Sequence, residues 1–474
     1  MEHVDPRLVR RARDAAAWIR EHRGRTVTVV HHVDADGVTA GAVALEALER
    51  AGIDAREVMV KSLDDLHVRK VLDAGPEALW FCDLGSAAYM RFPDVPRLVC
   101  DHHTLVRDGT EETFAHLNPQ LDGIDGGTVS GAGCAFLAAE ALDPVNADLL
   151  PLALVGASAD LQDRQGGFRG ADRALLEAGV AAGRLEAAWD LAWFGPESRP
   201  LRKYFGLARD PGVPTVTGDR RAVEAFFALL DIPLLAKGAE RTWGALREEE
   251  RRRIRSALVE RVLRAGLGAD HARRLFREVV RIAGEAPGPT RELQEYGTLL
   301  NSTARYDRPE VGLAVARGDR GDAYQEALGL LQGHRKHLVA ALDAFGQAGV
   351  AEEQGIQWVH LRDRVRDTVL GIVCGMALDG LGLRRDLALV GFAHTTDGRT
   401  KVSSRAPYEL QHRGIDLAAA MRTAAEAVGG QGGGHRGAAG ATIPRGTEAE
   451  FLRTVDPLVA AQTGRTSTVS PHRL

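Results

Sequence analysis

Short apolar runs alternate with helix-like segments through residues 1–190, and this alternation constrains the fold more than any other feature. Runs of strand length occur at residues 26–33 (TVTVVHHV), 55–61 (AREVMVK), 77–85 (EALWFCDLG) and 96–103 (PRLVCDHH). Loop or helix signals follow them, such as the apolar spacing of VTAGAVALEALERAG, which ends at Gly52. The alternation predicts an α/β fold with a parallel sheet covered by helices on both faces. Such sheets bind ligands at the carboxyl ends of their strands.

Acidic and histidine side chains gather at those strand ends. The first run leads into HVDADG, with His32, Asp34 and Asp36 before Gly37. Residues two apart on a strand share a face, so we expect these three side chains to converge, with Gly37 letting the chain turn. Further polar residues at run ends are Asp83, Asp101, His102 and His103, and the helix-rich LVGASADLQD adds Asp160 and Asp163. We expect them along one rim of the sheet.

This rim has the composition of a metal site. Several carboxylates within a few ångströms repel one another unless divalent metal offsets their charge. Mixed histidine and aspartate ligands suit Mn²⁺, Zn²⁺ or Fe, with Mn²⁺ favoured where oxygen ligands dominate. Two ions about 3.5–4 Å apart, bridged by one aspartate, would use six ligands well. Each motif alone also fits a plain turn or a helix N-cap, but together they predict a dinuclear site.

Three further segments follow. Residues 200–290 are rich in Arg, Glu, Leu and Ala, as in REEERRRIRSALVERVLRAG, and predict a helical insertion. A single connecting helix is expected over residues 320–349. Residues 357–474 return to alternation through IQWVHL, DTVLGIV, DLALVGFAH and TKVSSRA, and predict a second α/β domain. The expected parts are residues 1–199, 200–290, 291–349 (the end of the catalytic domain and the connecting helix) and 350–474.

Composition excludes several classes of protein. Hydrophobic residues make up 45% and charged residues 26% of the chain, which is typical of globular domains. A formal net charge of −5 excludes a globally basic nucleic-acid coat, so local patches would have to hold a nucleic acid. The N-terminus lacks an apolar signal-peptide core, and LLPLALVGASA is too short to span a bilayer. Four cysteines without CxxC spacing indicate reduced, buried thiols, so we expect a cytoplasmic protein without a membrane partner.

The motifs at these strand ends resemble those of the DHH phosphoesterase superfamily, which is named after the tripeptide at 101–103. HVDADG is similar to its first motif, the Asp83 strand end to its second, Asp101-His102-His103 to its third and Asp160 to its fourth. KVSSRA and the C-terminal GGGHRGAAG resemble its DHH-associated C-terminal domain. The resemblance implies an N-terminal doubly wound parallel-sheet DHH domain with a helical insertion, a connecting helix and a smaller C-terminal α/β DHH-associated domain.

Three details are similar to the RecJ-like nuclease branch. Val38 stands where short-oligonucleotide hydrolases and pyrophosphatases usually carry another aspartate. SGAGCAF at 130–136 resembles the helix start after the DHH strand, and NSTAR, with Asn301 and Arg305, resembles a motif that places an arginine on a substrate phosphate. The chain is short for bacterial RecJ. Its insertion at 200–290 is more similar to archaeal RecJ-like exonucleases that associate with the GINS replication complex.

The resemblance implies a role for each candidate residue. Two divalent ions, with Mn²⁺ favoured and Mg²⁺ the alternative, would be held by His32, Asp34, Asp36, Asp83, His102 and Asp160, with Asp83 as the bridge. Asp101 would orient the ligand histidines, and His103, pointing away from His102 on an extended chain end, would touch the scissile phosphate. Phosphate or substrate contacts would come from Asn301, Arg305, Ser403, Arg405, Gly432, Gly433, Gly434 and His435. The glycines would let backbone N–H groups approach a phosphate, and a flexible loop is the alternative.

The implied function is a metal-dependent exonuclease that degrades single-stranded nucleic acid, DNA more than RNA, to mononucleotides, typically 5′ to 3′ in this family. A nanoRNase or cyclic-dinucleotide phosphodiesterase is the enzymatic alternative, and a non-catalytic replisome scaffold is an alternative of another class. A GINS-type complex would dock on residues 200–290. The basic runs RPLRKY and REEERRRIR are interpreted as solvated helix faces, and Tyr204, Phe205 and Trp243 as core residues rather than base-stacking platforms.

Overall fold

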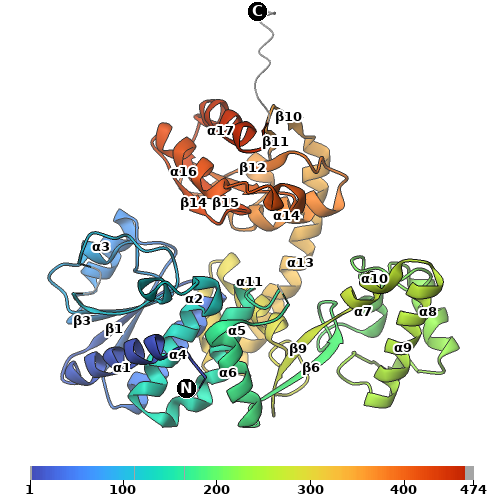
Figure 1. The fold of residues 1–474 in the computed structure, drawn as a ribbon, viewed down its shortest axis with the longest axis horizontal. Helices are drawn as coiled ribbons and strands as arrows, with labels where there is room; N and C mark the ends of the chain where they lie inside the picture. Colours follow the sequence, from blue (N-terminus) through green and yellow to red (C-terminus); the bar gives the residue numbers. More distant parts are fainter. Residues whose placement is uncertain (1–2, 111–112, 165, 465–474) are drawn as a thin grey trace, which may run out of the picture. The chain divides into compact units, whose positions relative to one another are not determined.

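The computed structural model of the chain describes residues 3–110, 113–164 and 166–464, and Figure 1 labels its elements. The chain divides into two compact units, Met1–Leu331 and Gln332–Leu474. The boundary falls inside α13 (Asp322–Ala348), where the sequence predicts a connecting helix. Each unit has hydrophobic cores of its own, so each is described by itself.

The described residues of the first unit form a five-stranded parallel sheet with the order β2-β1-β3-β4-β5. The strands are β1 (Val27–His32), β2 (Ala55–Val60), β3 (Ala78–Cys82), β4 (Arg97–Cys100) and β5 (Ala115–Leu117). The strand order reverses between β1 and β3, and open sheets of this order bind ligands beyond the carboxyl ends of the strands at that point.

Helices cover both faces of this sheet, which confirms the doubly wound fold. Side chains of β1 pack into a core on each face of the sheet. Val27 and Val29 lie in the larger core, and Val30 lies in the smaller core. The larger core packs against α1 (Pro6–Glu21), α2 (Ala35–Arg50), α4 (Gly131–Leu142), α5 (Leu150–Ala159), α6 (Gly170–Ala181), α11 (Leu293–Arg305) and α12 (Pro309–Ala316), and the smaller core against α3 (Asp65–Asp73).

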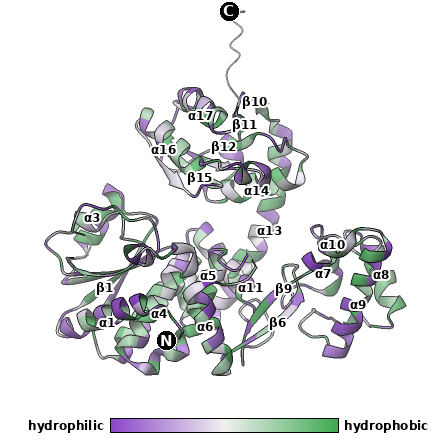
Figure 2. Cartoon of the chain, viewed as in Figure 1, coloured by the Kyte–Doolittle hydropathy of each residue, from purple (hydrophilic) through white to green (hydrophobic). Residues whose placement is uncertain are grey.

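A ribbon of two antiparallel strands, β6 (Leu185–Leu191) and β9 (Phe276–Ile282), leads into and out of the insertion (Figure 1). The insertion contains α7 (Leu201–Gly206), α8 (Arg220–Leu229), β7 (Leu235–Ala236), β8 (Ala239–Glu240), α9 (Glu248–Arg264) and α10 (Gly268–Arg274). Its core buries Tyr204, Phe205 and Trp243, as the sequence predicts. Hydrophilic and hydrophobic residues alternate along α9 in Figure 2, consistent with a solvated outer face.

The second unit contains a six-stranded mixed sheet with the order β10-β11-β12-β13-β15-β14. Its strands are β10 (Ala351–Glu352), β11 (Ile356–His360), β12 (Ala388–His394), β13 (Arg399–Arg405), β14 (Gln431–Gly434) and β15 (Ala438–Pro444). Its helices after α13 are α14 (Leu370–Gly380), α15 (Tyr408–His412), α16 (Leu417–Ala427) and α17 (Glu448–Gln462). The glycine-rich segment therefore forms an edge strand, β14, rather than a flexible loop.

The apolar run DTVLGIV is a helix rather than a strand. It begins with a 3₁₀ turn at Asp367–Val369 and continues into α14. Leu370, Val373, Cys374 and Ala377 are buried at the three- and four-residue spacing of one helical face. Burial on a period near 3.6 distinguishes this helix from the neighbouring strands, which are equally apolar.

All four cysteines are buried free thiols, as expected. Among the described helices, none has the length and apolar composition that crossing a membrane requires.

Candidate metal centre

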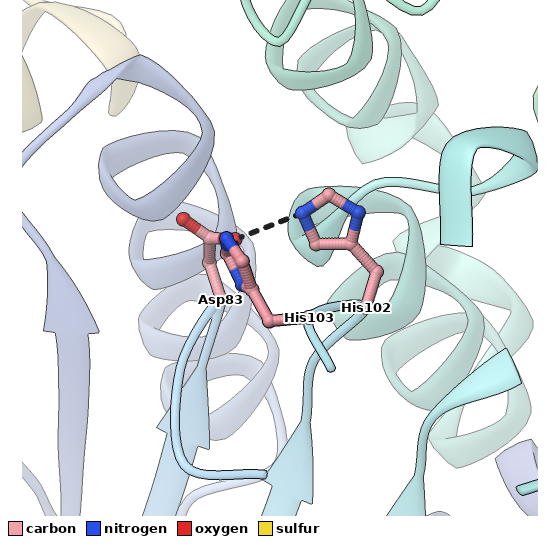
Figure 3. Close-up of side chains that lie close together, drawn as sticks. All are labelled: Asp83, His102 and His103. Carbon is pink, nitrogen blue, oxygen red and sulfur yellow. Dashed lines mark ion pairs between the residues drawn. The ribbon is translucent and has the colours of Figure 1, made fainter. Parts of the chain in front are cut away.

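Polar side chains from four segments of the chain meet at the carboxyl edge of the parallel sheet, next to the point between β1 and β3 where the strand order reverses. Within the described chain they form three overlapping groups whose ligand atoms lie within 4.8 Å of one another. The groups are His32-Asp34-Asp83, Asp36-His102-Asp160 and Asp83-His102-His103. The structure thus brings together every residue predicted as a metal ligand, and Figure 3 shows Asp83 beside His103, with a dashed line marking the contact between Asp83 and His102.

The first motif approaches the rim by a different geometry from the one predicted. β1 ends at His32, Asp34 is the N-cap of α2, and Asp36 lies in the first turn of that helix. The expected alternation along a strand is therefore wrong. Asp34 Oδ1 accepts the Gly37 N–H at 3.0 Å, and its Oδ2 lies 2.9 Å from His32 Nδ1. Gly37 is required by packing rather than by a turn, because a Cβ there would lie 2.5 Å from the His32 carbonyl oxygen.

Asp36 is held by the N-terminus of α4, the helix that SGAGCAF begins. Its Oδ2 accepts the Gly131 N–H at 2.8 Å and its Oδ1 accepts the Ala132 N–H at 3.0 Å. Helix N-termini favour negative charge, so this contact orients the carboxylate at the rim. A Cβ on Gly131 would lie 2.4 Å from Asp83 Cβ, and one on Gly156 of α5 would lie 2.2 Å from Asp36 Oδ1. Glycines thus allow the helices to approach the acids closely.

His102 presents one nitrogen to three carboxylates. Its Nδ1 donates to the Gly126 carbonyl oxygen at 2.9 Å, which leaves the lone pair on Nε2. Nε2 lies 3.5 Å from Asp83 Oδ1 and 3.7 Å from one oxygen each of Asp36 and Asp160. Two ligands about 2.0–2.2 Å from one ion lie roughly 3–3.5 Å apart, close to this spacing. The arrangement is that of a histidine prepared to coordinate a cation.

The electrostatics of the rim also fit a cation. Burial and the neighbouring Asp83 raise the pKa of Asp36 well above its usual range, and burial raises that of Asp160. Although burial disfavours the imidazolium of His102, the carboxylates of Asp83, Asp36 and Asp160 raise its pKa well above 6.5. Within the described chain, Asp83 Oδ1 and His102 Nε2 are buried without a hydrogen-bond partner. Asp83 also has a φ of 61°, a strained backbone that functional sites retain. These residues fit divalent metal.

Asp101 and His103 form a pair beside this cluster. Asp101 Oδ1 accepts the backbone N–H groups of His102 at 2.8 Å and His103 at 3.2 Å, and lies 2.8 Å from His103 Nδ1. Because one carboxylate accepts two successive backbone N–H groups, the chain turns at His102 and His103 and is not extended as expected. The centroids of the two imidazole rings therefore lie only 4.5 Å apart (Figure 3). Although burial opposes it, Asp101 raises the pKa of His103 to about 9, and the side chain is 50% exposed. Asp101 thus holds the His103 ring, whereas the Gly126 carbonyl holds the His102 ring.

Several residues that support the DHH segment were not found from the sequence. Gln120 Nε2 donates to the His102 carbonyl at 2.8 Å, and Asn118 Nδ2 donates to the His103 carbonyl at 3.0 Å. The Ser86 N–H donates to Asp101 Oδ2 at 3.0 Å. Asn118 lies before a proline and Ser86 in a loop, where such residues are common turn formers, so the sequence offers no signal that separates these roles.

The NSTAR segment lies at the end of α11 in the same unit. Asn301 Oδ1 accepts the Ala35 N–H at 3.1 Å and thereby holds the backbone between Asp34 and Asp36. Arg305 is half-buried in the last turn of the helix. Burial lowers the pKa of Arg305, and electrostatic attraction to the carboxylate of Asp34 opposes that shift. The guanidinium therefore interacts with one of the acids of the rim. Asn301 therefore positions the site loop, and Arg305 supplies positive charge near it.

The remaining predicted substrate residues lie together in the second unit. Ser403 and Arg405 are on β13, Gly432, Gly433 and Gly434 form β14, and His435 follows as an exposed residue. Arg405 Nη1 donates to the Ser404 carbonyl at 2.8 Å and to Ser403 Oγ at 3.4 Å. A Cβ on Gly432 would lie 2.4 Å from the Met421 carbonyl oxygen, so packing alone requires that glycine, whereas open space surrounds Gly433.

Two family models match the chain. The DHH-CID domain matches residues 193–276, which make up the insertion, and the DHHA1 domain matches residues 355–461, which contain most of the six-stranded sheet. The chain therefore contains a DHH-CID domain and a DHHA1 domain beside the parallel sheet with its aspartate–histidine rim. Its fold is RecJ-like.

The similar proteins span nearly the whole chain. An uncharacterized protein of Methanocaldococcus jannaschii is 24% identical over 456 residues, which are 94% of this chain and 96% of that protein. The structure of exonuclease RecJ bound to manganese is 20% identical with a TM-score of 0.56, covering 96% of this chain and 97% of that one. RecJ of Thermus thermophilus in complex with Mn²⁺ is 19% identical, with a TM-score of 0.58. The match covers 95% of this chain but only 55% of that RecJ, so this chain spans about half of its length. CDC45 of Entamoeba histolytica is 11% identical with a TM-score of 0.61, covering 94% of this chain and 97% of that one.

Proposed function

We propose that this protein is a DHH phosphoesterase, and specifically a metal-dependent, single-strand-specific exonuclease that hydrolyses phosphodiester bonds, releases mononucleotides and acts 5′ to 3′ on DNA. The observation that carries the proposal is the rim, where Asp83 and His102 each belong to two of the three ligand groups and so link them. The similarity to exonuclease RecJ bound to manganese supports the same activity and the same ion, Mn²⁺, with Mg²⁺ as the alternative.

Each residue of the rim would have a definite role. Two divalent ions would be held by His32, Asp34, Asp36, Asp83, His102 and Asp160. Asp83 would be the shared ligand, because its carboxylate takes part in two groups and offers two oxygens, whereas His102 offers only Nε2. Bound ions would activate water and offset the charge on the phosphate. His103, kept protonated by Asp101, would donate a hydrogen bond to the scissile phosphate. Arg305 would bind a phosphate from α11, and the second unit would bind the strand through Ser403, Arg405, Gly432, Gly433, Gly434 and His435.

The test is a time course on single-stranded 30-mers labelled at the 5′ or the 3′ end, as DNA and as RNA, with Mn²⁺ or with EDTA. We expect immediate release of labelled mononucleotide from 5′-labelled DNA, and no release in EDTA. Asp36→Ala should abolish the release, whereas Asp14→Ala, on the exposed face of α1, should not. Activity confined to di- to tetranucleotides would instead identify a small-substrate phosphodiesterase.

A non-catalytic scaffold is the second candidate, because the fold is equally similar to that of CDC45. In that case Asp36→Ala would leave the cellular role intact, and the purified chain would not cleave any strand. We further propose that a GINS-type complex docks on residues 200–290 and that the protein is cytoplasmic, where its free thiols stay reduced. Survival of GINS binding after replacement of the insertion would contradict the docking proposal.

A further inference from the structure

A cavity of about 590 Å³ lies between the core of the first unit and the insertion, apart from the metal-ligand groups. Its wall is built by the loop after α5, by the end of β6, by α7 and by β9. No part of the proposed function uses it. Five arginines of the described chain line it, namely Arg164, Arg199, Arg209, Arg274 and Arg277.

Of the three acids that line the cavity, two pair with arginines, and Asp163 is hydrogen-bonded through one of its two carboxylate oxygens. Asp210 pairs with Arg274, and Glu278 pairs with Arg173 at 2.7 Å. Asp163 Oδ2 accepts from Gln294 Nε2 at 2.9 Å. In contrast, the guanidinium groups of Arg164 and Arg209 have no hydrogen bond or ion pair with any residue that the structure describes. The wall therefore keeps unpaired positive charge, which suits a phosphate.

Aromatic faces accompany this charge. Trp189 on β6 is 68% exposed although it borders the cavity, and Arg199 stacks 4.8 Å above the ring of Phe194. An exposed indole face beside arginine forms a platform on which bases of nucleic acids stack, whereas Phe194 is half-buried beneath Arg199.

Unsatisfied polar atoms are a second, independent observation. The hydroxyl of Tyr204, a fully buried residue of the wall, has no hydrogen-bond partner among the described residues, and neither has Arg277 Nε or Asp163 Oδ1. Buried polar groups are normally paired, and an unpaired cluster in one wall indicates a ligand or water that completes it.

We propose that this cavity binds one nucleotide unit, with its base against Trp189 or Phe194 and its phosphate on Arg164 and Arg209. Its volume lies within the 300–1,000 Å³ or so that small-ligand pockets span. The loop that begins at Asp160 of the metal rim leads to Asp163 and Arg164 of the cavity wall, so an occupant would contact residues three and four positions after a candidate metal ligand. The proposal rests on the proposed function in that the nucleotide is either part of the substrate strand or the released mononucleotide.

The test measures binding to the full-length protein in EDTA, where cleavage does not occur. Calorimetry with dAMP and fluorescence anisotropy with a single-stranded DNA 12-mer distinguish the two sources. We expect Arg164→Ala/Arg209→Ala and Trp189→Ala each to weaken the Kd of at least one ligand tenfold or more, and Trp189→Phe to restore it. The matched control is Arg221→Ala, which removes an exposed arginine on α8 of the insertion, away from the cavity.

Loss of dAMP binding in the variants supports a mononucleotide site, and loss of 12-mer binding alone supports a strand site. Wild-type affinity of the variants for both ligands, or no binding of either ligand to the wild-type protein, overturns the proposal. Because binding is measured without metal, a failure here is distinguishable from a failure of the exonuclease proposal, which is read from cleavage with Mn²⁺.

Discussion

At the residue scale, Asp172 on α6 is a buried carboxyl group that the proposed chemistry does not use. It is fully buried, and neither of its carboxylate oxygens has a hydrogen-bond partner among the described residues. Burial raises the pKa of Asp172 from 3.8 to about 7. The folded protein therefore keeps a proton that the unfolded chain loses above pH 3.8, so stability falls as pH rises between these two pKa values.

Asp172→Asn should remove this loss of stability. At about 1.4 kcal/mol for each pH unit between the two pKa values, the variant should be more stable than the wild type at pH 8 by on the order of 4 kcal/mol. The difference should shrink as the pH approaches 4. Urea unfolding in EDTA at pH 5 and pH 8 measures it. An identical difference at both pH values would show that this carboxyl group does not titrate between them.

The sequence predicts which residues meet at the rim but not how they meet. Carboxyl ends of parallel strands share an edge, so Asp83 and the DHH tripeptide were predictable neighbours. The orientation of His103 was not, because it depends on Asp101 accepting two successive backbone N–H groups. The tautomer of His102 depends on the carbonyl of Gly126, which is 24 residues away and has no side chain to signal the contact.

At the element scale, the metal centre depends on three helices that approach one another closely. α2, α4 and α5 bring Asp36, Gly131 and Gly156 together, and any Cβ at either glycine would collide with an aspartate of the rim. Large steric conflicts of this kind force neighbouring side chains from their positions and cost about 1–3 kcal/mol. The conflict at Gly156 falls on Asp36 Oδ1 itself, so it should affect the site and not only the packing.

Gly156→Ala should therefore reduce the rate of mononucleotide release by tenfold or more and destabilise the protein by about 1–3 kcal/mol. Gly329→Ala is the matched control, because Gly329 lies in α13 with open space around the position of a Cβ. That control should keep full activity and gain up to about 1 kcal/mol from helix propensity. Cleavage assays and urea unfolding on both variants measure the two effects. Full activity of Gly156→Ala would show that the close contact of α5 with Asp36 does not affect the metal centre.

Elements were predictable where hydrophobic period and length agreed. β12 and the connecting helix follow from their sequence patterns, whereas DTVLGIV has the length and β-branched content of a strand and is a helix start. β14 was missed as a strand because four residues, three of them glycine, carry no strand signal. Its pairing with β15 and the contact of Gly432 with α16 decide its conformation, and both are tertiary.

At the scale of the whole molecule, the fold alone does not decide between an enzyme and a scaffold. RecJ and CDC45 share it with this chain at 20% identity or less. Function depends on the site that a fold carries, and here the rim brings together every aspartate and histidine predicted as a metal ligand. Because an ion that binds the folded protein raises its stability, metal binding by these residues can be measured from thermal unfolding without any substrate.

Mn²⁺ should raise the Tm of the wild-type protein, because ions that bind only the folded state stabilise it by about 2.7 kcal/mol at a concentration of 100 times Kd. Asp83→Asn should abolish most of that gain by removing a charge from two ligand groups at once.

The same substitution should not destabilise the protein in EDTA. It relieves repulsion among buried carboxylates, which offsets the loss of attraction to His102, and asparagine tolerates the left-handed φ of 61° at this position. Thermal unfolding with and without Mn²⁺ on both proteins, with Asp14→Asn as the surface control, measures the two effects. A Mn²⁺-induced shift of equal size in Asp83→Asn would contradict the metal centre, and a large loss of Tm in EDTA would show instead that Asp83 is needed for the fold.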